Sequence, residues 1–395
     1  MNCDCIKLRK TFTVPDRVKL ERFRRLPELG PAILFFSGGT AMSAAARVLG
    51  EYTHNSIHLM TPFDSGGSSA HLRHAFNMPA VGDIRARLMD LAEKKLYGNP
   101  EIYTLFAHRL DKAQPQERLY QELLSICHGS HPYIRAIPYP MRKIIRGNLM
   151  YFCEHMPDDF PLAGASIGNL VLASGYLEQR RHLDPAIFLY SKLVEVRGIV
   201  RPIVNSNAQL AARLQSGQVI CGQHNITGKE SPPLTSAIMN IWLTQDMDSG
   251  QPCHVPIRLK NSELIMRSDL ICYPFGSFFS SLLANLLPTG TVSAISQAFC
   301  NKIFIPNLGH DPELLGHTLQ SQVEILLERL TSEGAAPEQV LDALIIDRDY
   351  GYPGGVPWQW LQSRGIKILT VKLSSSVCAD RTDPRLVVET LLSLL

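Results

Sequence analysis

Long apolar runs are missing from this 395-residue sequence. No stretch reaches the roughly 18 consecutive apolar residues that a membrane-spanning helix needs, and Met1 to Cys5 do not begin a signal-peptide core. The nine cysteines are dispersed, as is typical of reduced thiols. Cys3-x-Cys5 has no second pair beside it, which favours a frayed terminus over a metal site. We therefore expect a cytoplasmic protein with no membrane partner.

The sequence also lacks a large excess of either positive or negative charge. The formal net charge is +3, and Lys and Arg are scattered apart from short groups at 7–10 and 22–25. A nucleic-acid-binding chain typically concentrates its basic residues in an arm or a stripe. We therefore expect no nucleic-acid partner.

The common catalytic fingerprints are absent as well. The sequence contains no G-x-x-x-x-G-K-[ST], no G-x-G-x-x-G, no H-E-x-x-H and no G-x-S-x-G. These absences argue against a P-loop NTPase, a standard dinucleotide fold, a zinc protease and an α/β-hydrolase. What remains is anion binding by backbone amides and small hydroxyls with one or two acids, which suits a nucleotide diphosphate with Mg²⁺.

The first glycine-rich corner follows the apolar run 32–36. Gly38, Gly39 and Thr40 stand between this predicted strand and a strong helix former at 41–49. A strand, a glycine turn and a helix start form a phosphate-binding geometry, because the unpaired amides of the first helical turn point at the anion. The same pattern also occurs as an ordinary turn.

A second corner follows the apolar run 57–61. It reads Asp64-Ser65-Gly66-Gly67-Ser68-Ser69, so it adds a carboxylate at the end of a strand. Ligands of open α/β sheets bind at the carboxyl ends of strands, so both corners should face one site. Asp64 is the candidate catalytic and metal-binding residue, and the candidate binding residues here are Ser65, Gly66, Gly67 and Ser68.

Further candidates come from the starts and middles of predicted helices. Asp83 lies at a helix start, where it can cap the helix, line the pocket together with Arg85, or do both. Asn169 follows Gly168 in an apolar helix predicted over 166–180, and the glycine indicates a close approach by a ligand or by another helix. The sequence alone supports these two explanations equally, and Asn169 is a candidate binding residue; we interpret His224 as a solvated loop residue.

A third corner follows the buried strand predicted over 269–273. Gly276 and Ser277 precede a predicted helix at 280–286, so this corner can hold a second phosphate or simply cap the helix. Asn307, at the end of a later strand, is an additional binding candidate.

Strands alternate with helices at both ends of the sequence, which predicts an α/β fold with a Rossmann-like, mostly parallel, doubly wound sheet. Residues 1–30 form an N-terminal extension, and 31–395 a single domain. Helical spacing predicts a helical insertion over about 97–197, and strand-like segments predict a small β arm over about 198–255. We expect both to cover the carboxyl edge of the sheet.

The ordered set of motifs resembles the phospholactate transferase (CofD-like) superfamily. The residues that carry this resemblance are 37–40, 64–73, 79–85, 168–170, 214–222, 269–288 and 352–355. One branch comprises the transferases of deazaflavin-coenzyme synthesis, and another the YvcK-type proteins, which bind sugar nucleotides. The resemblance covers the chain from about Ala32 to Leu395.

The resemblance implies a Mg²⁺-dependent transfer of a phospholactate or phosphoenolpyruvate group from a guanosine diphosphate donor to a hydroxyl. By motif, Gly38, Gly39 and Thr40 would hold donor phosphates. Asp64 would hold the metal or deprotonate the acceptor. The nucleotide pocket would be completed by Asn169, Gly276 and Ser277. A homodimer is plausible by the same resemblance.

One departure from the family pattern keeps two functions open. Both branches typically carry two consecutive acids at the second corner, whereas here the second position is Ser65. The first function is a CofD-like transferase that uses a nucleotide-diphosphate donor. The alternative is a YvcK-like regulatory protein that binds a nucleotide or UDP-sugar without turnover.

Overall fold

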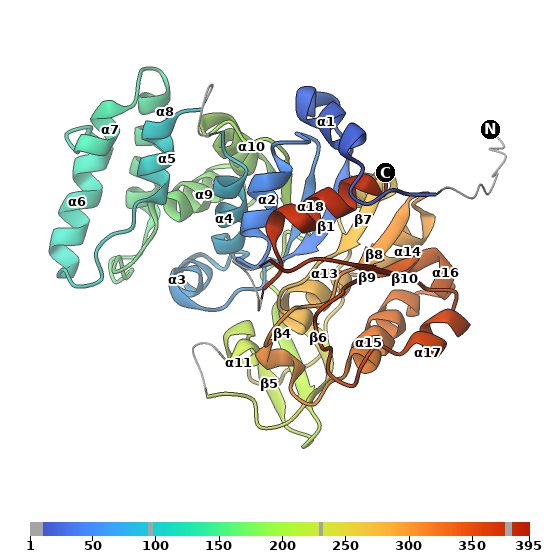
Figure 1. Ribbon diagram of the computed structural model, residues 1–395. Coiled ribbons are helices and arrows are strands. Elements are labelled where there is room, and N and C mark those ends of the chain that lie inside the picture. The colour runs from blue at the N-terminus through green and yellow to red at the C-terminus, as the bar shows by residue number, and fades with distance from the viewer. Residues whose placement is uncertain (1–10, 94–97, 229–231, 376–380) are drawn as a thin grey trace.

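The architecture is described from a computed structural model, for residues 11–93, 98–228, 232–375 and 381–395. Its centre is a parallel sheet of seven strands in the order β10-β9-β8-β7-β1-β2-β3 (Figure 1). The strands are β1 (Ile33–Ser37), β2 (Ile57–Met60), β3 (Ile199–Pro202), β7 (Leu270–Tyr273), β8 (Asn301–Phe304), β9 (Ala343–Asp347) and β10 (Lys367–Val371). This confirms the predicted doubly wound α/β fold.

The central strands are mostly apolar and are buried along their whole length because both faces of the sheet are covered. Every residue of β1, β2, β7 and β9 is buried. Continuous apolar runs, rather than alternating ones, are what a parallel sheet between two helical layers requires. The strands were predicted from such apolar runs, and their observed bounds differ from the expected ones by only a few residues.

The two halves of the sheet are wound in opposite directions from the β1–β7 junction. The chain moves outward from β1 to β2 and β3 on one side, and from β7 through β8 and β9 to β10 on the other. Because such crossovers are right-handed, their helices lie on opposite faces. The first half contributes α2 (Ser43–Leu49), α3 (Gly67–Phe76) and α4 (Gly82–Asp90). The second contributes α13 (Ala284–Leu286), α14 (Thr291–Gln297), α15 (Leu319–Thr331), α16 (Pro337–Val340) and α17 (Trp358–Ser363).

Helices near the two chain ends pack together beside the first half. The first helix, α1 (Arg17–Arg25), contacts the last helix, α18 (Pro384–Ser393), which in turn packs on α2. Asp16 caps α1, and its backbone amide also donates to Ser393 Oγ over 2.8 Å. The N-terminal segment therefore packs onto the C-terminal helix of the α/β unit.

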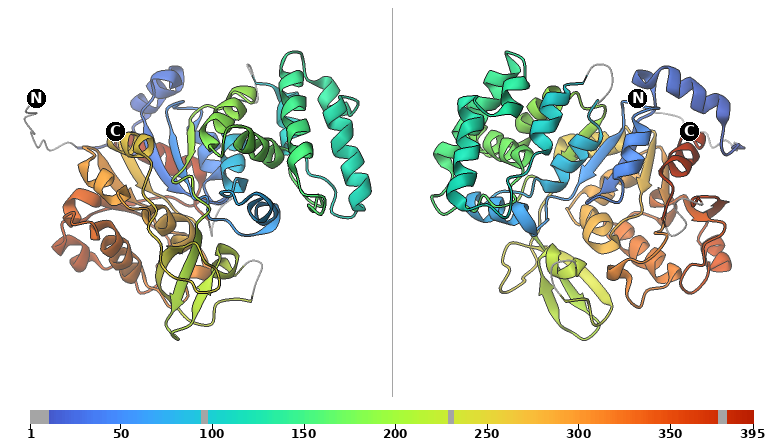
Figure 2. Two further views of the ribbon diagram at one scale, coloured as in Figure 1. Left: turned by 180° about the vertical axis from the view of Figure 1, so that it is seen from behind. Right: turned by 60° about the vertical axis from the view of Figure 1, so that its left-hand side comes forward.

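The predicted helical insertion lies to one side of the sheet (Figures 1 and 2). Its helices pack around an apolar core that also includes residues of α3 and α4. The Asp184 carboxylate at its end accepts hydrogen bonds from Arg201 of β3 and from Arg258, which fixes the insertion against the sheet. Its helices are α5 (Pro100–Ala107), α6 (Gln116–His128), α7 (Pro132–Ala136), α8 (Met141–His155), α9 (Ile167–Glu178) and α10 (Leu183–Leu193).

The β arm is a three-stranded antiparallel sheet in the order β5-β4-β6. It is formed by β4 (Gln209–Leu214), β5 (Val219–Cys221) and β6 (Ile238–Thr244), with the short helix α11 (Gln223–Thr227) after β5. The strand at 199–202, which composition grouped with the arm, is instead the edge strand β3 of the large sheet, paired in parallel with β2. Between the arm and β7 lies α12 (Leu259–Met266).

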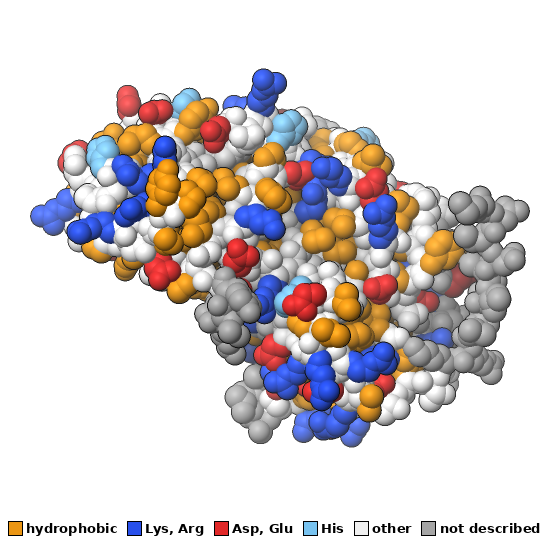
Figure 3. Space-filling model, turned by 90° about the horizontal axis from the view of Figure 1, so that it is seen from above, with side chains coloured by type: hydrophobic (Ala, Val, Ile, Leu, Met, Phe, Trp, Pro, Cys, Tyr) orange, Lys and Arg blue, Asp and Glu red, His pale blue; other side chains and the backbone are white. Residues whose placement is uncertain are grey.

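The face seen from above mixes basic, acidic and apolar side chains, and no single sign of charge dominates it (Figure 3). Across the described ranges, every helix is too short or too polar to cross a lipid bilayer.

Candidate functional site

The three predicted corners lie at the switch point of the sheet. The first follows β1, the second follows β2, and the third follows β7, and these three strands are neighbours in the order β7-β1-β2. Their parallel pairing brings their carboxyl ends to one edge. A crevice at this position is where open α/β sheets bind ligands.

The first corner needs glycine at two positions for two different reasons. Gly39 has a φ of +57°, in the left-handed region that side chains rarely adopt. Gly38 is packed so closely that an added Cβ would lie 2.6 Å from Thr61 Oγ1 and 2.9 Å from Ser281 Oγ. The first corner is therefore pressed against both neighbouring strand ends, and its Gly39 amide donates to Asp83 Oδ2 over 2.8 Å.

The second corner holds Asp64 between its own backbone and the start of α4. The Gly66 amide donates to Asp64 Oδ1 over 3.1 Å. An added Cβ at Gly82 would overlap Ser69 Oγ and lie 3.5 Å from Asp64 Oδ2. Gly82, which the sequence analysis did not single out, thus permits the close packing that puts Asp83 at the same site as Asp64.

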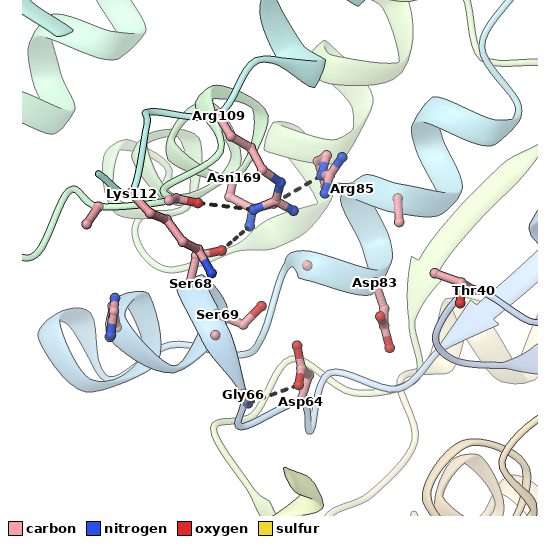
Figure 4. A pocket seen from close by; sticks show the side chains of 16 residues that line it. Thr40, Asp64, Gly66, Ser68, Ser69, Asp83, Arg85, Arg109, Lys112 and Asn169 are labelled. Atoms are coloured by element: carbon pink, nitrogen blue, oxygen red, sulfur yellow. Dashed lines mark hydrogen bonds between the residues drawn. The ribbon is translucent and has the colours of Figure 1, made fainter. Parts of the chain in front are cut away.

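Two cavities meet at these acids. The larger has a volume of about 370 Å³ and extends toward the helical insertion (Figure 4). The smaller, of about 210 Å³, extends toward the third corner and α11. Both are lined by Thr40, Asp64, Gly66 and Asp83.

Most of the predicted site residues line one cavity or the other. The larger cavity is also lined by Gly67, Ser68, Arg85 and Asn169, and the smaller by Gly39 and Ser277. Gly38, Ser65 and Gly276 belong to neither lining. They lie in the turns that support the lining residues.

Ser65 connects the second corner to the β arm. Its Oγ lies 2.8 Å from His224 Nδ1 and accepts the His224 backbone amide over 3.3 Å. The interpretation of His224 as a solvated residue was therefore wrong: it is half-buried and lines the smaller cavity. A lone loop histidine carries no signal in the sequence for such a long-range contact.

Arg73 is a further residue that sequence reasoning missed. It is buried in α3, and its guanidinium donates to the carbonyl oxygens of Phe63, Asp64 and Ala208 and to the Asn207 side chain. Burial lowers the pKa of Arg73 to about 10, an effect that the nearby Asp64 charge partly opposes. Arg73 thus fixes the backbone that carries Asp64 and ties it to the segment that precedes β4.

Asn169 and Arg85 meet at the far end of the larger cavity. Asn169 Oδ1 accepts from Arg85 Nε over 3.3 Å, and Asn169 Nδ2 donates to Ser68 Oγ over 3.3 Å. An added Cβ at Gly168 would approach Tyr190 Oη to 2.7 Å and Arg85 Cδ to 3.2 Å. The glycine therefore serves helix packing, while the adjacent Asn169 lies at the cavity.

The third corner differs from the other two because the carboxylates that accept from its amides are buried and line neither cavity. Phe278 N donates to Asp311 Oδ2, and Phe279 N and Ser280 N both donate to Glu313 Oε2. Gly276 exchanges hydrogen bonds with the Asn307 side chain. The amides at 278–280, which we expected to face a second phosphate, are thus satisfied internally. The helix predicted at 280–286 is present, as a π-helix over Phe278–Leu283 that continues into α13.

The donor set at the two acids fits a magnesium ion. Mg²⁺ is usually held by one or two carboxylates together with substrate phosphates, and it rarely has an all-protein cage. Asp64 and Asp83 line the same cavities, and the described residues contain no cluster of three His, Cys, Asp or Glu side chains arranged as metal ligands. The residue directly after Asp64 is Ser65, which has no carboxylate. The second carboxylate at the cavities is therefore Asp83, which comes from α4.

The fold and these cavities place the chain among doubly wound α/β proteins with a candidate ligand site at the switch point. Comparison with known proteins then identifies the family. The profile described as 2-phospho-L-lactate transferase CofD matches residues 33–353. The chain belongs to the CofD family.

Proteins similar in sequence include the gluconeogenesis factors of two bacilli. The Bacillus subtilis protein is 27% identical over 301 residues, which cover 76% of this chain and 75% of the relative. The Halalkalibacterium halodurans protein is 26% identical over 297 residues, which cover 75% and 73%. A crystal structure of a UPF0052-family protein from Bacillus halodurans superposes with a TM-score of 0.68 at 22% identity. It covers 92% of this chain and 99% of that one, and supports the same fold.

Replacing Arg73 by Met should destabilise the protein strongly. The change leaves the buried carbonyl oxygens of Phe63, Asp64 and Ala208 without their donor, and an unsatisfied buried group costs about 1–3 kcal/mol. We expect the free energy of unfolding in urea to fall by about 3 kcal/mol or more. Arg135→Met on exposed α7 is the control. A loss no larger than that of the control would show that Arg73 does not hold this loop.

Glu313 should make stability depend on pH. Burial and the neighbouring Asp311 charge raise its pKa to about 7, although hydrogen bonds from Ser280 and Phe279 oppose the shift. The folded chain thus keeps a proton that the unfolded chain releases above its ordinary pKa of 4.5. The free energy of unfolding should therefore fall as pH rises from about 4.5 to 7, by up to about 1.4 kcal/mol per pH unit.

Glu313→Gln should flatten this dependence, because the amide does not titrate. Urea denaturation of the wild type, Glu313→Gln and the exposed control Glu338→Gln at pH 5 and pH 7.5 measures it. Equal pH slopes in the wild type and Glu313→Gln would contradict the assignment.

Proposed function

We propose that this protein is a CofD-like, Mg²⁺-dependent transferase that binds a nucleotide-diphosphate donor at the two joined cavities. The donor is of the guanosine-diphosphate-linked phospholactate or phosphoenolpyruvate type, and its phospho-acid group passes to an acceptor hydroxyl. The observation that carries the proposal is the convergence of Asp64 and Asp83 with the corners after β1 and β2 on one pair of cavities.

Family membership supports the reaction class, and the lining supports the ligand class. The amides at the N-terminus of α3 and the hydroxyls of Thr40, Ser68 and Ser277 are groups that bind phosphate oxygens. Bound Mg²⁺ would neutralise charge on the transferred phosphoryl group. Such a transfer requires little beyond positioning and charge neutralisation, which agrees with the absence of a recognisable nucleophile motif.

The residues of this chain would divide the remaining work. The acceptor oxygen bonds to the phosphorus that carries the acid, the bond from this phosphorus to the bridging oxygen breaks, and nucleoside monophosphate leaves. The proton of the acceptor hydroxyl needs a base. Asp64 either takes this proton or shares the metal with Asp83. Arg73 is a positioning residue, since it contacts Asp64 only through the backbone.

A second candidate function is the binding of a nucleotide or UDP-sugar without turnover, as in a YvcK-like regulatory protein. The specific observation that favours it is Ser65, which stands where both family branches typically have a second acid and which is engaged by His224. A site with one acid fewer beside Asp64 is less suited to holding a metal and accepting a proton at once.

A ligand screen with the variant Asp64→Asn tests the proposal. Thermal unfolding is measured with GDP, GTP, UMP and UDP-sugars, with and without Mg²⁺. We expect guanosine diphosphates to raise the Tm of the wild type only when Mg²⁺ is present. Asp64→Asn should lose this Mg²⁺ dependence and keep its fold, because Asn Oδ1 can still accept the Gly66 amide.

The control is Asp158→Asn, an exposed carboxylate outside both linings, which should behave as the wild type. Unchanged Mg²⁺ dependence in Asp64→Asn would contradict the role given to Asp64. Tight UDP-sugar binding without Mg²⁺ and without release of a nucleoside monophosphate would support the binding protein instead.

A further inference from the structure

The larger cavity has an acidic end and a basic end. Asp64 and Asp83 lie toward the sheet, whereas Arg85, Arg109 and Lys112 lie at the opposite end, toward the helical insertion (Figure 4). Magnesium and phosphates account for the acidic end. Nothing in the proposed reaction so far uses Arg109 or Lys112, which lie outside the glycine-rich corners.

Arg109 and Lys112 are exposed, and the fold fixes the backbone that carries them. The chain at 109–110 is clamped to 164–166, since Leu110 N donates to Ala165 O over 2.9 Å and Gly164 N donates to Leu110 O over 3.0 Å. The guanidinium of Arg109 also donates to Gly164 O over 3.1 Å. An added Cβ at Gly164 would lie 2.6 Å from Lys112 Cε, so this glycine leaves room for the lysine stem to lie across it.

The opposite wall of the basic end is fixed as well. Arg85 comes from α4, and its Nε is held by Asn169, which is in turn anchored to Ser68 at the start of α3. Two elements therefore supply the cluster, α4 and the segment between α5 and α6, while α9 supplies the supporting Asn169.

Among the described residues, the hydrogen-bond partners of Arg85 and Arg109 are neutral. Arg85 donates to an amide oxygen and Arg109 to a carbonyl oxygen. None of the ion pairs within 4.0 Å in the described part of the chain includes Arg85, Arg109 or Lys112. Partial burial lowers the pKa of Arg109, and the like charge of Arg85 adds to this effect. Cations gathered in this way repel one another unless an anion joins them.

We propose that Arg85, Arg109 and Lys112 form a subsite for a second oxyanion of the ligand, a carboxylate or a phosphate, apart from the phosphates at Asp64 and Asp83. The ligand is thus an acidic conjugate of a nucleotide, with its diphosphate at one end of the cavity and a free oxyanion at the other. Guanidinium groups suit this task because they bind carboxylate and phosphate oxygens through paired hydrogen bonds. The inference depends on the proposed function in one respect only, the position of the diphosphate in the cavity.

Matched pairs of sugar nucleotides test the subsite. UDP-glucose and UDP-glucuronate differ by a carboxylate, as do GDP-mannose and GDP-mannuronate. Each pair therefore measures the effect of a second anion while the nucleobase stays the same. Calorimetric titration with Mg²⁺ should give the wild type at least a roughly tenfold lower Kd for the acidic member of the pair that binds. Arg109→Gln combined with Lys112→Gln should abolish this preference by raising the Kd of the acidic member toward that of the neutral member.

The exposed Arg118→Gln, which lies in the same insertion outside the cavity lining, should keep the full preference. Equal affinity for neutral and acidic members in the wild type would overturn the subsite, and so would a preference that survives in the double variant. If no nucleotide binds at all, the proposed function fails.

A separate measurement keeps the subsite testable in that case. Inorganic phosphate without Mg²⁺ should raise the Tm of the wild type and of Arg118→Gln more than that of the double variant. An equal response of all three proteins would overturn the subsite whatever the nucleotide result. If the sugar nucleotides bind but show no preference within a pair, a phosphate response confined to the wild type and Arg118→Gln would indicate an adventitious ion only and would also overturn the subsite.

Discussion

The site depends on the close packing at the β1–β7 junction, where the sheet changes its winding direction. Gly38 lies in contact distance of hydroxyls that follow β2 and that belong to the π-helix after β7. Asn285, buried beneath this junction, donates to the carbonyl oxygen of Ser37 over 3.0 Å and so holds the end of β1 against the second half of the sheet. Because the strand ends are fixed in this way, corners that lie more than 200 positions apart in the chain border the same cavities.

Within this frame, the chain's own carboxylates accept hydrogen bonds from the amides of all three corners. Asp83 accepts from Gly39, Asp64 from Gly66, Asp311 from Phe278, and Glu313 from Phe279 and Ser280. The consequences differ by position. Asp64 and Asp83 line the cavities, so a cation can draw their oxygens toward it and leave the amides to phosphate. Glu313 is buried, and its bonds instead stabilise the start of the π-helix. The third corner therefore contributes mainly through the Ser277 side chain.

The sequence was sufficient for the fold and for the position of the site, but not for its supporting contacts. Apolar runs followed by glycine and serine predict strand ends, and neighbouring parallel strands must present those ends at one edge. Asp64, Asp83 and Asn169, which line the larger cavity, were accordingly named as candidates from local pattern and family resemblance. Arg73 and His224 were not, because their partners lie 134 and 159 positions away, and no local spacing encodes such contacts. The strand at 199–202 was grouped with the arm because composition indicates that a segment forms a strand but not which sheet that strand joins.

The helical insertion changes what the site can recognise. Glycine corners at the strand ends of doubly wound sheets bind phosphate mainly through backbone amides, and such amides do not distinguish one phosphate ester from another. Discrimination must then come from side chains beyond the sheet edge. Here they come from the segment between α5 and α6, which is clamped to the chain ahead of α9 and places Arg109 and Lys112 opposite the acids. The sheet thus supplies the anion-binding frame common to such folds. The insertion sets the charge at the other end of the cavity and, under the subsite proposed above, the kind of ligand that this chain selects.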